Sequence, residues 1–387
     1  MKVVLVAPYD FHSHGIRGLH SFVEAQGIDV ASFYFHFSTY TDGPYTDKEI
    51  SIFVDHIVKQ KPDFVGIGVR SPLFPLFADL STRIRKALPN ARIISGGPHS
   101  SADPNGCLRY ADHAVIGDGE YALMDILCGA PKGRIRSSRF MELDSLPFEK
   151  YGEGTHTFCR AIKPPGKFSV STTRGCIFAS CSYCQESVLG YKPVRKSVKR
   201  FKEEYDYFLS LFPMIRVMTF TDSIFLYDED WLEEFASTFS GSGMRFYCAA
   251  YAPIITDEIL KIAKKAGIER VRVGVQSGDS KVRREIYNRK DSLDDIKRAA
   301  ELLHKNQMVG NFDFIIESPY DTAETIAATR RFIQGLPKSA VTNKFELRYW
   351  PHTPLTDRAL KDGYIKEDEI EGNFLRFGDW TYCYKVV

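Results

Sequence analysis

Three cysteines within nine residues, Cys176, Cys181 and Cys184, constrain this chain more than any other feature of its sequence. Four thiolates hold a complete 4Fe–4S cluster, so a loop with three thiols and no evident fourth leaves one iron without a protein ligand. That iron is then open to a substrate or a cofactor. The loop therefore predicts a metal and catalytic centre whose protein ligands are these three thiols.

Two ordinary alternatives compete with the cluster. A tetrahedral zinc site also uses Cys and His ligands at short spacing. However, no His falls between Cys176 and Cys184, and the nearest, His156, precedes Cys176 by 20 residues. A disulfide suits a secreted chain, whereas three thiols do not pair off and no signal peptide is evident. Both alternatives are weaker than the cluster.

The segment TTRGC (172–176) followed by CSYC (181–184) resembles the cluster-binding loop of the radical S-adenosylmethionine (SAM) superfamily. The usual spacing in that family is CxxxCxxC, whereas four residues separate Cys176 from Cys181 here. We expect the extra residue to bulge out, which loops tolerate. The resemblance implies a 4Fe–4S cluster and SAM as cofactors, with Tyr183 at the aromatic position beside the adenine.

Length and composition frame the rest of the chain. Its 387 residues, 44% of them hydrophobic, exceed one ordinary domain and predict two. Lys and Arg number 51 against 49 Asp and Glu, so we expect no nucleic-acid partner. No run of apolar residues is long enough to span a membrane, so we expect a soluble, cytoplasmic protein without a membrane partner. The five remaining cysteines are predicted to be reduced, buried apolar residues: Cys107, Cys128, Cys159, Cys248 and Cys383.

The first third of the chain alternates strands and helices, which predicts an α/β domain with an open parallel sheet. Short apolar runs predict strands at residues 3–7, 63–69 and 91–95, and residues 18–26 read as a helix stopped by Gly27. Ligands of such sheets bind at the carboxyl ends of the strands. The polar and glycine residues at those ends are therefore candidate site residues: Asp10, Arg70, Ser71, Gly96, Gly97, Gly117 and Glu120.

These strand ends together resemble the cobalamin (B12)-binding domain of class B radical SAM enzymes, a flavodoxin-like Rossmann domain, over residues 1–130. Ser71 and Leu73 match its SxL element, and Gly96 and Gly97 match its GG element. The resemblance implies cobalamin as a third cofactor.

The lower ligand of cobalt has two candidates. The run DFHSHG (10–15) satisfies the DxHxxG pattern that places His12 on cobalt, with Asp10 orienting the imidazole. Alternatively, His12 belongs to a turn that opens the following helix. Arg70 would then face the lower side of cobalt, because it ends the strand just before Ser71.

Residues 131–166 resemble the linker of two-domain family members. From residue 167 the alternation resumes and predicts a partial (β/α)6 barrel of the TIM type over 167–350, followed by a C-terminal extension, 351–387. Its strands are expected at residues 168–172, 216–220, 245–251, 270–275, 311–316 and 345–350.

Polar residues follow two of these barrel strands. Asp222 and Ser223 lie where related enzymes hold the methionine amino group of SAM, and Gln276 and Ser277 resemble the segment near its ribose and carboxylate. Each also has an ordinary explanation as a helix cap or turn residue. Their recurrence at successive strand ends favours a site, because barrel enzymes collect their active sites there.

The resemblance implies a radical SAM methyltransferase. In it, a 5′-deoxyadenosyl radical removes hydrogen from an unactivated carbon, which then takes a methyl group from methylcobalamin. The short layout is similar to enzymes that methylate a glutamine α-carbon in methyl-coenzyme M reductase, which suggests a protein or peptide substrate; a small molecule is the alternative. An external donor of the flavodoxin or ferredoxin type would supply electrons. Two other functions stay open: a cobalamin-dependent rearrangement or cyclisation, and a non-catalytic cobalamin or SAM sensor.

Overall fold

The computed structural model describes residues 1–8, 13–36, 45–136, 138–159, 168–316 and 318–372. Asp10, His12 and Cys383 lie outside these ranges, so their predicted roles stay predictions. The described residues up to 159 and from 349 to 372 form one compact unit, and residues 168–348 form a second. Within these ranges, every helix is too short or too polar to cross a membrane.

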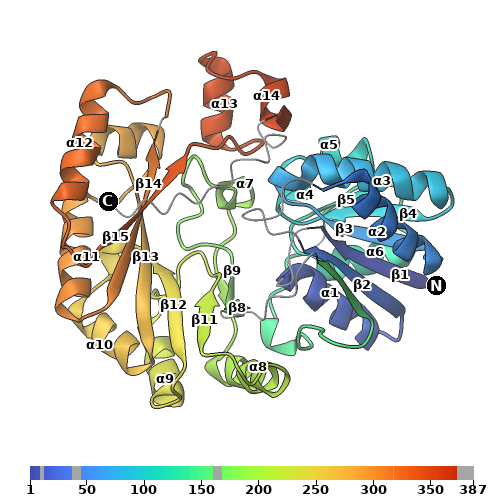
Figure 1. The fold of residues 1–387 in the computed structure, drawn as a ribbon, viewed down its shortest axis with the longest axis horizontal. Coiled ribbons are helices and arrows are strands. Elements are labelled where there is room, and N and C mark those ends of the chain that lie inside the picture. The colour runs from blue at the N-terminus through green and yellow to red at the C-terminus, as the bar shows by residue number, and fades with distance from the viewer. Residues whose placement is uncertain (9–12, 37–44, 137, 160–167, 317, 373–387) are drawn as a thin grey trace. The chain divides into compact units, whose positions relative to one another are not determined.

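The first unit is built on a seven-stranded, wholly parallel sheet (Figure 1). Its strand order is β6-β5-β4-β3-β1-β2-β7. The bounds are β1 Lys2–Ala7, β2 Asp29–His36, β3 Phe64–Gly68, β4 Arg92–Gly96, β5 His113–Ile116, β6 Gly133–Arg136 and β7 Thr155–Cys159. The order reverses between β1 and β3, which is the switch point where ligands of such sheets bind.

Helices cover both faces of this sheet. On one face, Val3 and Leu5 pack against α1 (His14–Ala25) and α6 (Gly119–Leu127). The other face, with Val4 and Val6, packs against four helices: α2 Asp47–Lys59, α3 Phe74–Ala87, α4 Pro98–Ala102 and α5 Pro104–Leu108. The unit also contains α13 (Pro354–Lys361) and α14 (Glu367–Gly372). The predicted parallel Rossmann-like sheet is confirmed.

The segment expected as a linker, 131–166, contributes β6 and β7 to the two edges of this sheet. Arg17 explains why the chain between these strands stays on the first unit. Its buried guanidinium lies 4.0 Å from the Tyr34 ring centroid and 3.9 Å from that of Tyr151, and it donates to the Lys150 carbonyl at 2.6 Å. Because these partners lie far apart in sequence, the linker composition did not reveal the docking.

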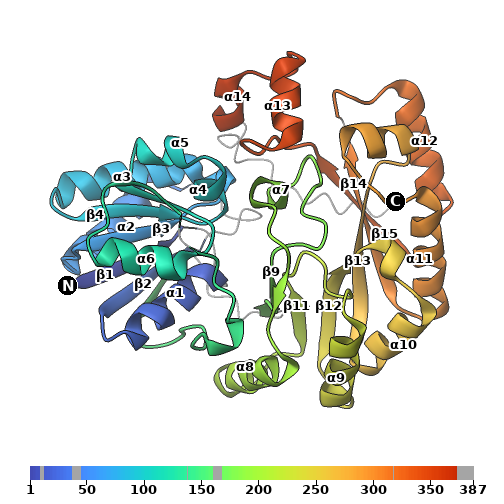
Figure 2. The ribbon, with the colours of Figure 1, turned by 180° about the vertical axis from the view of Figure 1, so that it is seen from behind.

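The second unit carries a six-stranded parallel sheet in the order β15-β14-β13-β12-β11-β8 (Figure 2). Its strands are β8 Phe168–Val170, β11 Val217–Phe220, β12 Arg245–Ala250, β13 Ile268–Gln276, β14 Val309–Ile316 and β15 Val341–Glu346. A small hairpin, β9 (Thr173–Arg174) with β10 (Val194–Arg195), follows β8. The predicted partial barrel is confirmed.

Helices alternate with the strands of the second unit, as the sequence pattern predicts. They are α7 Glu186–Leu189, α8 Val198–Leu211, α9 Glu229–Phe239, α10 Asp257–Lys265, α11 Leu293–Lys305 and α12 Ala323–Gln334. Phe220 and Phe246 pack against Phe235 of α9, so this face of the sheet is the core beneath the helices.

The last barrel strand was predicted four residues too late, at 345–350 instead of Val341–Glu346. The aromatic run FELRYW suggested a strand. The hydrogen-bonded register with β14 instead begins at Val341, opposite Asn311, and has ended before Tyr349. The pairing with β14, and not the local composition, thus determines where this strand begins and ends.

The cysteines outside the loop differ in burial. Cys107 and Cys248 are buried as predicted, whereas Cys128 is exposed, because it follows the last turn of α6 at the surface. The prediction was wrong for Cys128. The side chain of Cys159 and all of Cys383 lie outside the described part of the chain.

Candidate cofactor-binding sites

The cysteine loop begins at the carboxyl end of β8, and Asp222 fixes this end. Its carboxylate accepts hydrogen bonds from the backbone N–H groups of Thr172 at 2.8 Å and Thr173 at 2.6 Å, and from the Thr172 hydroxyl at 2.8 Å. Burial raises the pKa of Asp222, and the bond from Thr172 opposes this shift. Asp222 therefore holds the strand that leads into the loop; a contact with SAM stays a prediction.

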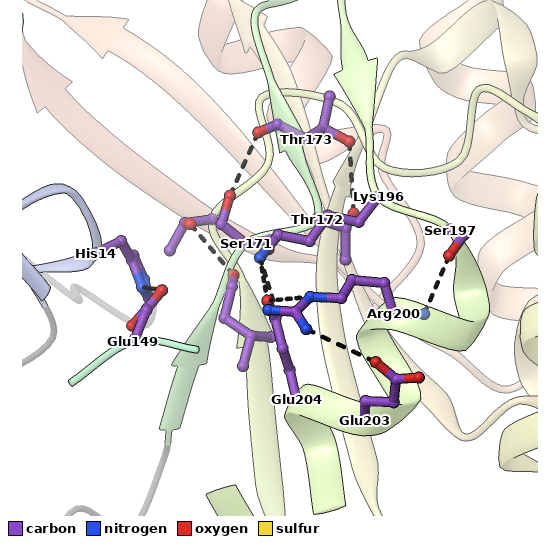
Figure 3. Close-up of polar contacts among 12 residues, drawn as sticks. His14, Glu149, Ser171, Thr172, Thr173, Lys196, Ser197, Arg200, Glu203 and Glu204 are labelled. Carbon is purple, nitrogen blue, oxygen red and sulfur yellow. Dashed lines mark hydrogen bonds and ion pairs between the residues drawn. The ribbon is translucent and has the colours of Figure 1, made fainter. Parts of the chain in front are cut away.

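Lys196 provides a second attachment at the same strand end (Figure 3). Its ammonium donates to the Ser171 carbonyl at 3.1 Å and to both oxygens of Glu204 at 2.8–2.9 Å. Glu204 is almost fully buried and also lies 3.4 Å from the Arg200 guanidinium. Because a buried carboxylate is tolerated only when it is paired, this network anchors the end of β8 on helix α8.

The three predicted ligands come together after this anchored strand. Cys176 and Cys181 are buried, and Cys184 is half-buried. Burial, together with the neighbouring Cys181 and Cys176, raises the pKa of the Cys184 thiol to about 12. Cluster assembly must therefore remove a proton from this thiol.

The chemistry of these side chains suits a cluster. Among the described residues, no three His, Cys, Asp or Glu side chains gather as the ligands of one metal ion would. A 4Fe–4S cluster places each thiolate on a different iron. Three thiols on one loop are the donor set of that group, and Cys176, Cys181 and Cys184 are the residues that would hold it.

The loop between Cys176 and Cys181 contains one residue with an unusual backbone conformation. Ala179, between the first two cysteines, has φ of 41°. This value lies in the left-handed region of backbone conformation, which residues other than glycine rarely adopt. Such a conformation costs about 1–3 kcal/mol and persists only where its surroundings impose it. The loop between the first two cysteines therefore contains a strained turn at Ala179.

Replacing Ala179 by Gly is expected to preserve cluster content and to slow loss of iron to a chelator, because Gly adopts this conformation without strain. Ala179→Val adds β-branching in the left-handed region, and we expect at least a two-fold faster loss. Timed iron release to a chelator under anaerobic conditions measures both. Equal rates in the two variants would contradict a strained turn.

Gln276 and Ser277 differ in the roles that the structure gives them. Gln276 ends β13 with φ of 66° at a register shift, and its buried Oε1 has no hydrogen-bond partner among the described residues. An unpartnered buried acceptor fits a ligand that donates a hydrogen bond. The Ser277 hydroxyl instead accepts from Asp279 N–H at 3.1 Å and lies 3.3 Å from the Thr329 hydroxyl, so it supports a turn.

Tyr183 lies within the cysteine loop, and Ser223 contacts the chain just after it. The Ser223 hydroxyl donates to Glu186 at 2.9 Å, just after the last cysteine. The Tyr183 ring meets that of Tyr287 edge-on, with 5.5 Å between centroids. Burial raises the pKa of Tyr183, so its hydroxyl is protonated at neutral pH. The predicted contact between Tyr183 and adenine stays a prediction.

Three hydrogen bonds that the sequence did not indicate fasten the loop to the segment after β13. Ser182 donates to the Ile286 carbonyl at 2.5 Å, Asn288 donates to the Ser180 carbonyl at 2.7 Å, and Arg289 donates to the Cys181 sulfur at 3.6 Å. More than 100 residues separate the partners. No local pattern indicates these contacts.

In the first unit, Ser71 follows strand β3 and the glycine pair lies at the end of strand β4, close to the switch point between β1 and β3. Gly97 has φ of 91°, and a Cβ there would lie 3.2 Å from the Val69 carbonyl oxygen, so Gly97 serves backbone packing. A Cβ on Gly96 would meet nothing within 4 Å. Leu73 packs against the core, and Arg70 is exposed. Gly96 is thus the glycine that leaves room for a ligand.

The remaining candidates of the first unit, Gly117 and Glu120, follow the end of β5. Gly117 has φ of 87° and donates to the Ser101 hydroxyl at 3.0 Å. Glu120 is buried in the first turn of α6. His14, the first residue of α1, contacts Glu149 at 2.9 Å (Figure 3).

His99 is the residue of this edge that the sequence reasoning missed. Its Nδ1 lies 2.9 Å from the buried Ser71 hydroxyl, and its ring lies 4.5 Å from that of Phe74. Burial lowers the pKa of His99 to about 4, so the ring is neutral at neutral pH. Its buried Nε2 has no partner among the described residues. This unpartnered nitrogen and the space at Gly96 fit a large ligand with polar groups.

Fold and site define an open-sheet ligand-binding domain joined to a partial barrel with a three-thiol loop. Residues 2–127 match the model of the B12 binding domain, and residues 170–333 match that of the radical SAM superfamily. The chain belongs to the class B, cobalamin-dependent radical SAM enzymes. Its cofactors are a 4Fe–4S cluster, SAM and cobalamin.

Solved structures share this architecture. The radical SAM methyltransferase TsrM from Kitasatospora setae superposes with a TM-score of 0.76 at 17% identity, covering 93% of this chain and 76% of TsrM. The cobalamin-dependent SAM radical enzyme OxsB superposes with a TM-score of 0.65 at 17% identity, covering 96% of this chain and 56% of OxsB.

A curated relative is the anaerobic magnesium-protoporphyrin IX monomethyl ester cyclase of Rubrivivax gelatinosus. It is 22% identical over 85% of this chain. The match covers 65% of the cyclase, so the chain spans less than two thirds of that protein's length.

Proposed function

We propose that this protein is a cobalamin-dependent radical SAM C-methyltransferase. The observation that carries the proposal is the shared architecture with the methyltransferase TsrM over 93% of this chain. When bound, the cluster and SAM supply a hydrogen-abstracting radical, and cobalamin supplies the methyl group. The substrate carbon therefore needs no acid or base from the protein, and the chain's own residues act by binding and positioning.

The residues of the second unit position the cluster and SAM. Asp222 and Lys196 hold the strand that enters the loop, and the three thiols would hold the cluster. Gln276 offers its unpartnered acceptor to a donor group of SAM. In the first unit, we propose that Ser71 and His99, which are hydrogen-bonded to each other, contact cobalamin.

A polar row on the helix-free face of the barrel sheet is the proposed substrate wall. Arg272 is ion-paired with Asp313, whose carboxylate also accepts from the Asn343 amide at 2.8 Å. Arg270 lies with its guanidinium 5.0 Å from the Tyr247 ring centroid. Burial raises the pKa of Asp313, and Arg272 opposes this. A wall of guanidinium and amide groups suits a polar substrate.

A peptide segment is the substrate class that we favour, and a small polar molecule is the alternative. A glutamine α-carbon of methyl-coenzyme M reductase is the specific candidate from the short two-domain layout. None of the relatives named above bears that activity in its name. An external one-electron donor of the flavodoxin or ferredoxin type completes the proposal.

Cyclisation is the second candidate function, because the curated relative at 22% identity is named as a cyclase. The two candidates differ in what they do with SAM. A methyltransferase consumes SAM both as a radical source and as a methyl donor. A cyclase needs SAM only as a radical source.

The deciding experiment uses the reconstituted full chain with cobalamin, reductant and SAM carrying a 13C-labelled methyl group. Methyl transfer predicts that label enters the cobalamin fraction while S-adenosylhomocysteine is released. Formation of 5′-deoxyadenosine with no label transfer would favour the cyclase. Absence of both products would favour the third possibility, a non-catalytic cobalamin or SAM sensor.

A further inference from the structure

Arg289 is held rigidly beside the cysteine loop. It follows the π-helical turn Val282–Ile286 after β13, and its side chain is about one-tenth exposed. Its Nε and Nη2 donate to the two oxygens of Asp291 at 2.9 and 3.1 Å, and Nη2 also donates to the Gly274 carbonyl at 3.2 Å. A bidentate pair of this kind fixes the plane of the guanidinium.

This orientation directs the remaining nitrogen at a cluster ligand. Nη1 of Arg289 donates to Sγ of Cys181 at 3.6 Å. The guanidinium lies 5.4 Å from the ring centroid of Tyr251 and 5.9 Å from that of Phe178. Aromatic rings replace water on these sides, which strengthens the electrostatic effect of the charge.

The net charge of the ionised side chains beside Cys181 is positive. The Asp291 carboxylate is fully buried and is shared by two guanidinium groups, those of Arg289 and Arg283, the second at 2.8 Å. One positive charge therefore remains in excess in this group.

We infer that Arg289 sets the reduction potential of the cluster through its hydrogen bond to Cys181. A cluster that accepts one electron from an external donor gains negative charge. A cationic N–H donor on a ligand sulfur stabilises that reduced form and raises the potential, because hydrogen bonds to sulfur and nearby charge are what set it. The inference requires the cluster but not the proposed methylation, so either can fail alone.

The test is a redox titration of the anaerobically reconstituted full chain, followed by electron paramagnetic resonance without SAM. Arg289→Gln removes the charge, and we expect at least a tenfold shift of the one-electron equilibrium toward the oxidised cluster, about 59 mV to lower potential. Arg289→Lys keeps the charge but loses the bidentate fork, so we expect a smaller shift in the same direction.

Asn288→Gly is the matched control. It removes the 2.7 Å hydrogen bond to Ser180 between the same two segments, and Gly adopts the φ of 52° found at Asn288 without strain. Its potential is expected to equal that of the parent. Arg289→Gln with full iron content and an unchanged potential would overturn the inference. Weaker SAM binding in that case would assign Arg289 to SAM instead.

If Arg289→Gln assembles no cluster, Arg289→Lys decides the question. An unchanged potential in this variant likewise overturns the inference.

Discussion

Replacing Cys176, Cys181 and Cys184 together by Ala is expected to remove more than nine-tenths of the iron and sulfide that the reconstituted chain binds. Thiolates are the ligands of a 4Fe–4S cluster, and these three cysteines lie in the segment that matches the radical SAM superfamily model. Radical chemistry that depends on the cluster is lost with it. Iron and sulfide analysis, with 5′-deoxyadenosine formation from SAM, measures the effect.

Cys128→Ala is the control for this triple variant, because Cys128 is an exposed cysteine outside the loop. We expect its iron and sulfide content to match the parent chain. Retention of cluster iron in the triple variant would refute the assignment of the three ligands. Loss of iron in Cys128→Ala would show that the assay reports thiol damage instead.

Asp222→Ala is expected to reduce cluster content at least five-fold, although Asp222 is not a proposed cluster ligand. The change leaves the N–H groups of Thr172 and Thr173 without their acceptor. Each unsatisfied buried group costs about 1–3 kcal/mol, and these two groups lie in the strand that enters the cysteine loop. Iron and sulfide per chain after reconstitution give the measurement.

Asp222→Asn separates this positioning role from a contact with SAM. The amide keeps an oxygen for the two N–H groups, so we expect near-parental cluster content and SAM affinity. Full cluster content with a large loss of SAM affinity would instead place the charge of Asp222 on SAM. Ser223→Ala removes the hydrogen bond to Glu186 and tests the predicted SAM contact of Ser223 separately from that of Asp222.

The sequence was sufficient for the strand ends but not for the contacts made there. Ser71, Gly96 and Gln276 are recognisable because glycine and polar residues follow short apolar runs, and the structure places all three at strand ends. What Asp222 and Ser277 bind could not be read from the same pattern. Their partners, Thr172 and Thr329, lie about 50 residues away in sequence.

Long-range packing also explains the errors in the fold. The segment between β6 and β7 has the composition of a linker, yet the buried Arg17 holds it on the first unit through Tyr151 and the Lys150 carbonyl. Strand β15 was misplaced because its position depends on pairing with β14, not on its own aromatic residues. His99 was unrecognisable because a single His after a glycine pair has no distinguishing spacing.

The most direct test of the account is the electron paramagnetic resonance spectrum of the full chain, reconstituted anaerobically with iron, sulfide and cob(II)alamin. The account predicts a protein-bound cob(II)alamin signal and, after reduction, a 4Fe–4S signal that changes shape when SAM is added. A cob(II)alamin spectrum identical to that of the free cofactor, with a cluster signal insensitive to SAM, would contradict it.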